Sequence, residues 1–270
     1  MTIASRQNPL VKQLRKLHHA KHRREQNLFL LEGTHLIETA YAANSSFDTL
    51  CCTDLWLQKH PQLWQRVSKR ANRQEKITSS VLSAIATTVH PDGVIATVKK
   101  SQIKPQLQNL QLGLMLERLQ DPGNLGTILR TALAAGVDGV WLSDDSVDSD
   151  NPKVLRASAG ASFHLPIAIS HDLAKTITEA QSYGIRIIAT TSVASQTYWK
   201  INWNQPNLIL LGNEGSGLSE ELLSLADERV MIPLDSRVES LNVAIASSLL
   251  LYEAIRQRNL PIANSDHNDS

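Results

Sequence analysis

The sequence lacks the segments that would place it in or across a membrane. No uncharged apolar run reaches the roughly 18 residues that a membrane-spanning helix needs. Its first residues, MTIASRQNPLVK, lack the apolar core of a secretion signal. We therefore expect a cytoplasmic protein with no membrane partner, and 270 residues with 42% apolar content allow one or two well-packed domains.

Cysteine is scarce, and metal-ligand spacing is absent. Cys51 and Cys52 are the only two cysteines, and adjacent cysteines make a poor disulfide. No cluster of His and Cys has the spacing of a metal site. The acidic run over residues 144–150 imitates one but is more typical of a solvated loop. We expect two packing cysteines and no bound metal.

The usual phosphate-binding motifs are also missing. The stretch LGNEGSGLSE (211–220) follows the apolar run NLILL and holds Gly212, Gly215 and Gly217, but it fits neither GxxxxGK[ST] nor GxGxxG. A nucleotide- or NAD-binding oxidoreductase is therefore disfavoured. Such glycines either let a backbone approach a ligand closely or form a tight strand-to-helix connection capped by Ser219.

Charge is divided between the two halves of the chain. The net charge is only +1, yet residues 1–110 carry 16 Lys and Arg against 7 Asp and Glu, while residues 111–270 carry 11 against 19. This asymmetry predicts that the first half binds a polyanion, most plausibly nucleic acid. The alternative is a solvated basic face.

The first half reads as a small α/β domain over residues 1–104. NPLVKQLRKLHHAKHRREQ predicts a helix that begins at Pro9, with Val11, Leu14 and Leu17 on its packed face. Strand and helix patterns then alternate from FLLEG to GVIATVKK. The basic side chains of the helical segment are the candidate RNA contacts: Lys12, Arg15, Lys16, Lys21, Arg23 and Arg24.

The second half, residues 105–260, predicts a parallel sheet covered on both faces, followed by a disordered tail over 261–270. Its strands are continuous apolar runs that alternate with helices. Ligands of such sheets bind beyond the carboxyl ends of the strands. Three polar loops fall there: DPGNLG, LGNEGSG and PLDSRVESLN.

Three segments are recognisable together. DPGNLGTILRTALAAG, LILLGNEGSGLS and IPLDSRVESLNVAIASSLLLYE resemble, in order, the three motifs of the SpoU (TrmH) family of RNA 2′-O-ribose methyltransferases. SRQNPLVKQLRKL and FLLEGTHLIETA are similar to the ribosomal-protein-like substrate-binding domain of many members. The chain departs from the family at Ser236, where Gly is frequent, and at Ala244, where Ser is frequent.

The resemblance implies a SPOUT fold: an α/β parallel-sheet domain with a deep trefoil knot, preceded by a smaller α/β RNA-binding domain. It implies S-adenosylmethionine as cofactor and transfer of its methyl group to a ribose 2′-hydroxyl. The implied catalytic residues are Asn124, Arg130, Glu214, Ser240 and Asn242, with Arg130 also contacting RNA. The implied cofactor-binding residues are Leu211, Gly212, Asn213, Glu214, Gly215, Gly217, Ile232, Pro233, Leu234, Leu241 and Asn242.

The implied partners are a structured RNA and a second copy of the chain. Large-subunit (23S) ribosomal RNA is the expected substrate. The alternatives are transfer RNA and a catalytically silent protein that only binds RNA and dimerises. The terminal helix LNVAIASSLLLYEAI is apolar around almost its full circle, so we expect another subunit to cover the face that a monomer would leave in water.

Overall fold

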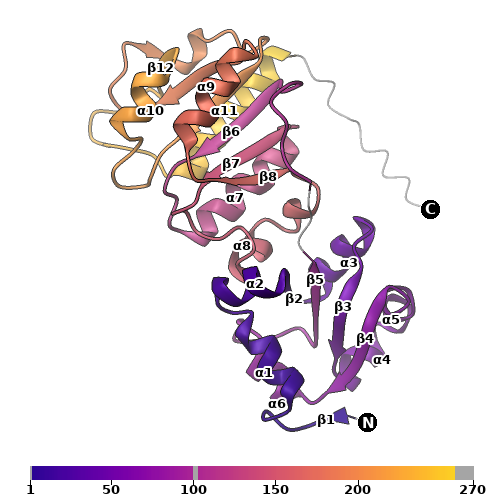
Figure 1. The fold of residues 1–270 in the computed structure, drawn as a ribbon. Helices are drawn as coiled ribbons and strands as arrows, with labels where there is room; N and C mark the ends of the chain where they lie inside the picture. Colours follow the sequence, from indigo (N-terminus) through magenta and orange to yellow (C-terminus); the bar gives the residue numbers. More distant parts are fainter. Residues whose placement is uncertain (1, 100–102, 259–270) are drawn as a thin grey trace, which may run out of the picture.

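The computed structural model describes residues 2–99 and 103–258, and the expected disordered tail lies outside the described residues. Two sheets form two bodies stacked end to end, with the N-terminal body at the bottom of Figure 1 and the C-terminal body at the top. The sheets lie on either side of the expected domain boundary, and the boundary itself stays a prediction. No helix in the described ranges is long and apolar enough to cross a membrane.

The N-terminal sheet is mixed and has the strand order β1-β4-β3-β5-β2. β1 and β3 run parallel to β4, whereas β5 is antiparallel to β3 and β2. In this spatial order the strands are Thr2–Ile3, Ala71–Ile77, Phe47–Cys52, Val94–Lys99 and Leu28–Glu32. The helices α1 to α6 are Pro9–Lys16, Ala20–Gln26, Thr34–Ala42, Asp54–Lys59, Pro61–Ser68 and Ser79–Ile85.

The basic segment at the start of the chain forms two helices where the sequence predicted one. α1 begins at Pro9, capped by the Asn8 side chain, and gives way after Lys16 to a turn before α2. α1 and α6 cover one face of the sheet, while α3 and α5 cover the other. α1 and α2 therefore carry separate groups of exposed basic side chains.

The C-terminal sheet is wholly parallel, as the continuous apolar runs predicted. Its strand order is β10-β12-β9-β11-β6-β7-β8. In this spatial order the strands are Gln196–Thr197, Glu228–Met231, Arg186–Thr190, Asn207–Leu211, Leu112–Leu116, Gly139–Ser143 and Ile167–Ser170. The helices α7 to α11 are Pro122–Ala134, Pro152–Ala157, Leu173–Ser182, Glu220–Leu225 and Val243–Arg258.

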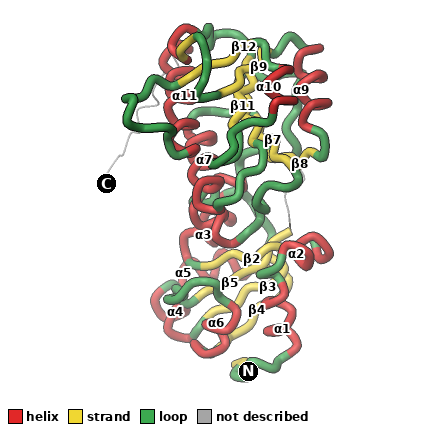
Figure 2. The backbone as a smooth tube through the Cα atoms, turned by 90° about the vertical axis from the view of Figure 1, so that its left-hand side faces the viewer, coloured by secondary structure: helices red, strands yellow, loops and turns green. Residues whose placement is uncertain are grey.

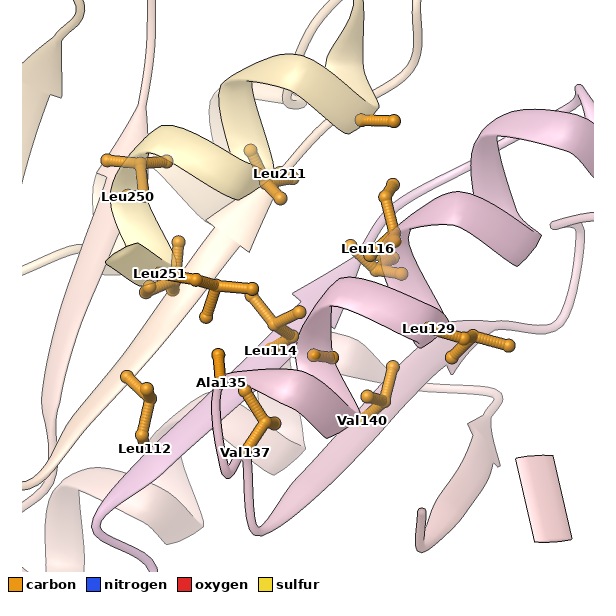
Figure 3. Packing of buried hydrophobic residues seen from close by; sticks show 14 of the residues in the cluster. Leu112, Leu114, Leu116, Leu129, Ala135, Val137, Val140, Leu211, Leu250 and Leu251 are labelled. Carbon is orange, nitrogen blue, oxygen red and sulfur yellow. The ribbon is translucent and has the colours of Figure 1, made fainter. Parts of the chain in front are cut away.

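Helices cover both faces of this sheet. α7 and α11 lie side by side over one face, where Leu114, Leu129 and Leu251 join one cluster (Figure 3). α9 and α10 cover the opposite face around Met115 and Trp141. Burial on both faces explains why these strands read as unbroken apolar runs. The α/β architecture with a smaller preceding α/β domain is thus confirmed, whereas the trefoil knot stays a prediction.

Three elements of the N-terminal domain were not predicted: the two-residue strand β1, the strand β4 and the helix α4. β4, ANRQEKI, is a strand although most of its residues are exposed and polar, so no apolar alternation marked it. It is held by backbone pairing with β3 and β1 on either side. The missed helix α4 begins at Asp54, where the Thr53 side chain accepts the Trp56 N–H.

Candidate functional site

The central strands of the C-terminal sheet bring two of the three polar loops together. β11 pairs with β6 so that Leu211 lies opposite Leu116, and both strands end there. The glycine loop that follows Leu211 and the loop that leads into α7 therefore start side by side. The Glu117 N–H donates to the Leu211 carbonyl (2.9 Å). The pairing register of β11 and β6 thus places both loops at the carboxyl edge of the sheet.

Three side chains from the three loops form one hydrogen-bonded chain. Asn124, in the first turn of α7, donates from Nδ2 to Glu214 Oε1 (3.1 Å). Asn242, just before α11, donates from Nδ2 to Asn124 Oδ1 (2.9 Å). The Asn242 Oδ1 atom caps α11 by accepting the Ala244 N–H (2.9 Å). We call these three residues the Asn124–Glu214–Asn242 network.

Glu214 is held as a carboxylate. Besides Asn124, its oxygens accept the backbone N–H groups of Gln120 and Asp121, each at 3.3 Å. Partial burial opposes the charged form, but these hydrogen bonds outweigh it and hold the pKa of Glu214 below its ordinary value. Such a carboxylate is a weak base at neutral pH. Its geometry suits it to join the glycine loop to the α7 loop.

The glycine loop is shaped by its own backbone and by Asn213. The Asn213 Oδ1 atom accepts the N–H groups of Gly215 (2.9 Å) and Ser216 (3.0 Å), and its Nδ2 donates to the Arg118 carbonyl (2.8 Å). A Cβ at Gly212 would lie 2.1 Å from the Gly217 carbonyl carbon. Gly217 itself has a φ of +68°. Two of the three glycines are therefore required by the fold of the loop.

The loop borders a cavity of about 400 Å³ at the carboxyl edge of the sheet. Of the expected cofactor-binding residues, Pro233 and Asn242 are absent from its lining, while those that do line it are Leu211, Gly212, Asn213, Glu214, Gly215, Gly217, Ile232, Leu234 and Leu241. The expected catalytic residue Ser240 lines it too. A cavity of about 470 Å³ near Phe29 and Phe163 contains none of these residues.

The sequence reasoning missed part of the cavity wall. Thr190, the last residue of β9, lines the cavity, as do Thr191 and Ser192, which follow it, and Glu239. The strand pattern of IRIIATT was recognised, and the position of its last residues at the same carboxyl edge was the available signal. Three hydroxyl side chains at a strand end suit the recognition of a polar ligand.

Arg130 stands apart from the network. It lies six residues after Asn124 on α7, so at 100° per residue its side chain is rotated by about 240°, and the two side chains point about 120° apart. Arg130 is exposed and does not line the cavity. No ion pair or hydrogen bond of its side chain is found within residues 2–99 and 103–258. Four of the five expected catalytic residues border or build one site, and Arg130 does not.

Comparisons with known proteins decide the family. The SpoU rRNA methylase family matches residues 111–252, and the MRM3-like substrate-binding domain matches residues 8–96. The chain belongs to the SpoU rRNA methylase family. The site just described thus lies wholly within the SpoU methylase domain, and the mixed sheet with α1 and α2 forms its substrate-binding domain.

Three similar proteins cover nearly the whole chain. An uncharacterized tRNA/rRNA methyltransferase of Synechocystis sp. is 48% identical over 95% of this chain and 94% of its own. The 23S rRNA (guanosine(2553)-2′-O)-methyltransferase RlmP of Bacillus subtilis is 32% identical, covering 93% and 97%. The crystal structure of an AdoMet-bound rRNA methyltransferase from Sinorhizobium meliloti superposes with a TM-score of 0.84 at 31% identity, covering 95% and 97%. The similarity to these three proteins therefore extends over both domains of this chain.

The substrate-binding domain places five of its six candidate RNA contacts in solvent. Lys12, Arg15, Lys16, Lys21 and Arg24 are exposed on α1 and α2. Arg23 is different, because only 4% of it is exposed and its guanidinium bonds to Asp148 of the SpoU domain. A phosphate cannot reach a buried, paired guanidinium. The structure therefore removes Arg23 from the set of direct RNA contacts.

Proposed function

We propose that this protein transfers a methyl group from S-adenosylmethionine to a ribose 2′-hydroxyl of 23S ribosomal RNA. The observation that carries the proposal is the convergence of the Asn124–Glu214–Asn242 network and the glycine loop around one cavity. Membership of the SpoU rRNA methylase family supports it, as does the name of the Bacillus subtilis relative, a 23S rRNA guanosine 2′-O-methyltransferase. The site keeps the residues that a catalytically silent protein has no need to keep.

The cavity fits the cofactor. Its volume of about 400 Å³ lies within the range of small-molecule sites. A Cβ at Gly215 would meet only the Asn213 Oδ1 atom, at 3.5 Å, so the outer side of the glycine loop is open to a ligand. Backbone groups of the loop and the hydroxyls of Thr190 and Thr191 offer hydrogen bonds to an adenosine and an amino-acid group.

The cofactor, when bound, supplies an electrophilic methyl group, and the chain's own residues do the rest. Transfer to a ribose hydroxyl requires placement of the two reactants and removal of one proton. Because guanidinium groups stay protonated in proteins, we assign Arg130, which lies outside the cavity of its own chain, to bind the RNA phosphate beside the reacting ribose and to stabilise the developing alkoxide once RNA is bound. The proton leaves through Ser240 or a water molecule to the solvent, and Glu214 keeps the loops aligned.

We also propose that the active form is a homodimer, built on the exposed face of α11. Ile245, Leu249 and Tyr252 recur on one side of this helix and are 52%, 38% and 54% exposed. They border an open cavity together with Tyr198. An apolar stripe of this kind on a terminal helix is typical of an interface with another subunit. A second copy would cover the stripe and bring two SpoU domains together.

Methyl transfer in vitro tests the enzyme proposal. The purified protein is incubated with methyl-labelled S-adenosylmethionine and, separately, with ribosomal RNA and transfer RNA. Alkaline hydrolysis then distinguishes the products, because a 2′-O-methyl group blocks cleavage of the next phosphodiester bond. The proposal expects label in alkali-resistant dinucleotides from ribosomal RNA. Label in bases, or label only in transfer RNA, contradicts the assignment, and no transfer to either RNA favours the silent alternative.

A further inference from the structure

A short segment of the SpoU domain packs into the substrate-binding domain. Leu155 of α8 is fully buried within the core cluster of the N-terminal sheet, beside the β2 strand. The Phe163 ring lies 6.1 Å from the Phe29 ring of β2. A Cβ at Gly160 would lie only 2.5 Å from the Thr39 side chain. Residues 152–163, which we call the wedge, are therefore shared by both domains. Figure 1 shows α8 at the junction of the two bodies, and in Figure 2 this junction lies between α7 and α3.

The other side of the wedge touches the helix that carries the site. α8 packs on α7, and a Cβ at Gly126 would lie 2.4 Å from the Ala157 Cβ atom and 2.8 Å from the Val154 carbonyl oxygen. Gly126 stands two residues after Asn124. The substrate-binding domain is thus connected, through one short helix, to the N-terminal part of α7 that carries Asn124.

Two arginine–carboxylate pairs cross the junction, and each domain supplies the arginine of one pair and the carboxylate of the other. Arg23 of the substrate-binding domain donates from Nε (3.0 Å) and Nη2 (2.6 Å) to Asp148 Oδ2 of the SpoU domain. Arg156 of the wedge lies 3.2 Å from Glu32 Oε2 of β2 and donates to Thr87 Oγ1 (2.8 Å). Paired guanidinium groups of this kind fix direction as well as distance.

Arg23 also holds the basic helices. Its Nη1 atom donates to the carbonyls of Leu17 (2.7 Å) and His18 (2.9 Å), the two residues that directly follow α1. One buried side chain therefore joins the end of α1, the body of α2 and the SpoU domain. The apolar face of α1 packs on the N-terminal sheet by itself, so the junction bears on where the exposed cations lie relative to the SpoU domain.

We propose that Arg23 and Arg156 are positioning residues that fix the two domains in one orientation. The fold then sets the distance from the exposed cations of α1 and α2 to the Asn124–Glu214–Asn242 network. An RNA bound by its phosphates meets the methyl-transfer site without a further ordering step, which lowers the entropic cost of productive binding. The consequence for RNA rests on the proposed function, whereas the fixed orientation does not.

Distance measurement tests the fixed orientation without RNA. Spin labels are placed on Gln65→Cys in α5 and Glu179→Cys in α9, both exposed, while Cys51 and Cys52 are fully buried. Labelled protein is diluted with unlabelled protein to suppress signals between subunits. The unaltered junction should give one narrow distance distribution. Asp148→Asn combined with Arg156→Ala should broaden or shift it.

Arg186→Ala is the matched control, because Arg186 is about as exposed as Arg156 but pairs with Glu228 inside one sheet. It should leave the distribution unchanged. A broad distribution with the intact junction, or an unchanged narrow one in the double variant, overturns the proposal. Asp148→Asn alone keeps the side-chain shape and serves if the double variant does not fold.

Salt dependence of RNA binding separates positioning from contact. Arg24→Ala removes an exposed cation and should lower the slope of log K against log[salt] by about 0.7 to 0.9 for one phosphate contact. Asp148→Asn should raise KM for RNA at least five-fold with the slope, kcat and cofactor affinity unchanged. A reduced slope or an unchanged KM in Asp148→Asn overturns the positioning role. If the unaltered protein binds no RNA, the proposed function fails, and the distance measurement still decides the orientation.

Discussion

Gly212→Ala tests whether the glycine loop is shaped by its own backbone. The new Cβ atom would lie 2.1 Å from the Gly217 carbonyl carbon and 2.2 Å from the Leu218 nitrogen. Ordinary contact begins at 3.4 Å, so the backbone must withdraw by about 1.3 Å. Both obstructing atoms belong to the main chain, and no side-chain rotation relieves the clash. The loop must leave the path that borders the cavity.

Overpacking of this kind costs about 1 to 3 kcal/mol. If cofactor binding must restore the native path, its affinity falls by about 5- to 140-fold. Isothermal titration of S-adenosylmethionine into both proteins gives the ratio directly, with the melting temperature measured in parallel. Gly215→Ala is the matched control, because its Cβ meets only one side-chain atom at 3.5 Å. Its melting temperature should equal that of the unaltered protein.

The reasoning is refuted if Gly212→Ala binds the cofactor within about three-fold of the unaltered protein. It is equally refuted if Gly215→Ala loses as much stability as Gly212→Ala, since the structure gives the two positions opposite surroundings. A loss of affinity in Gly215→Ala without loss of stability shows instead that the cofactor itself touches the open side of the loop.

Three further predictions concern single side chains. Arg130→Ala should lower the rate of methyl transfer by about 10²- to 10³-fold with cofactor affinity within a few-fold, and single-turnover kinetics that show a normal rate would remove Arg130 from catalysis. Because its pKa is lowered on folding, the Glu214 carboxylate stabilises the loop fully above about pH 4.3, and this stabilisation is lost as pH falls through the lower folded pKa. Glu214 therefore does not titrate near neutral pH, and Glu214→Gln should leave the pH–rate profile between about pH 6 and 8 unchanged. Loss of an ionisation in that range would make Glu214 a base. Burial raises the pKa of Cys51 to about 12 and of Cys52 to about 11, so a thiol reagent at about pH 8 should label neither until the protein unfolds, and fast labelling of the native protein would contradict their burial.

Much of the fold could be predicted from apolar periodicity, and the elements that were missed are those in which this periodicity is absent. The helix Leu173–Ser182 and the buried strands Leu112–Leu116 and Asn207–Leu211 carry clear patterns because their faces are packed. β4 carries none, since backbone pairing with its neighbours holds it. The break between α1 and α2 was missed because Lys16 and Ala20 both suit a helix, and the bonds from Arg23 to the carbonyls of Leu17 and His18 leave no periodic signal.

Of the candidate site, too, only the residues with a local sequence signal could be predicted. Local spacing and the family motifs were sufficient to select Asn124, Glu214 and Asn242, which the structure joins by hydrogen bonds. They could not show that Arg23 turns inward, because its partner Asp148 lies 125 residues away in the sequence. Nor could helical spacing alone say what surrounds Arg130. Long-range pairing of charges leaves no periodic signal.

Ribose-methylation maps of cellular RNA test the central claim most directly. Total RNA from cells with and without the gene is hydrolysed by alkali and sequenced, so that each 2′-O-methyl group appears as a protected position. The account predicts that a 2′-O-methyl site in 23S ribosomal RNA disappears in the deletion. The intact gene should restore it, and a copy carrying Arg130→Ala should not. Identical maps with and without the gene, or the loss of a base methylation in place of a ribose methylation, would contradict it.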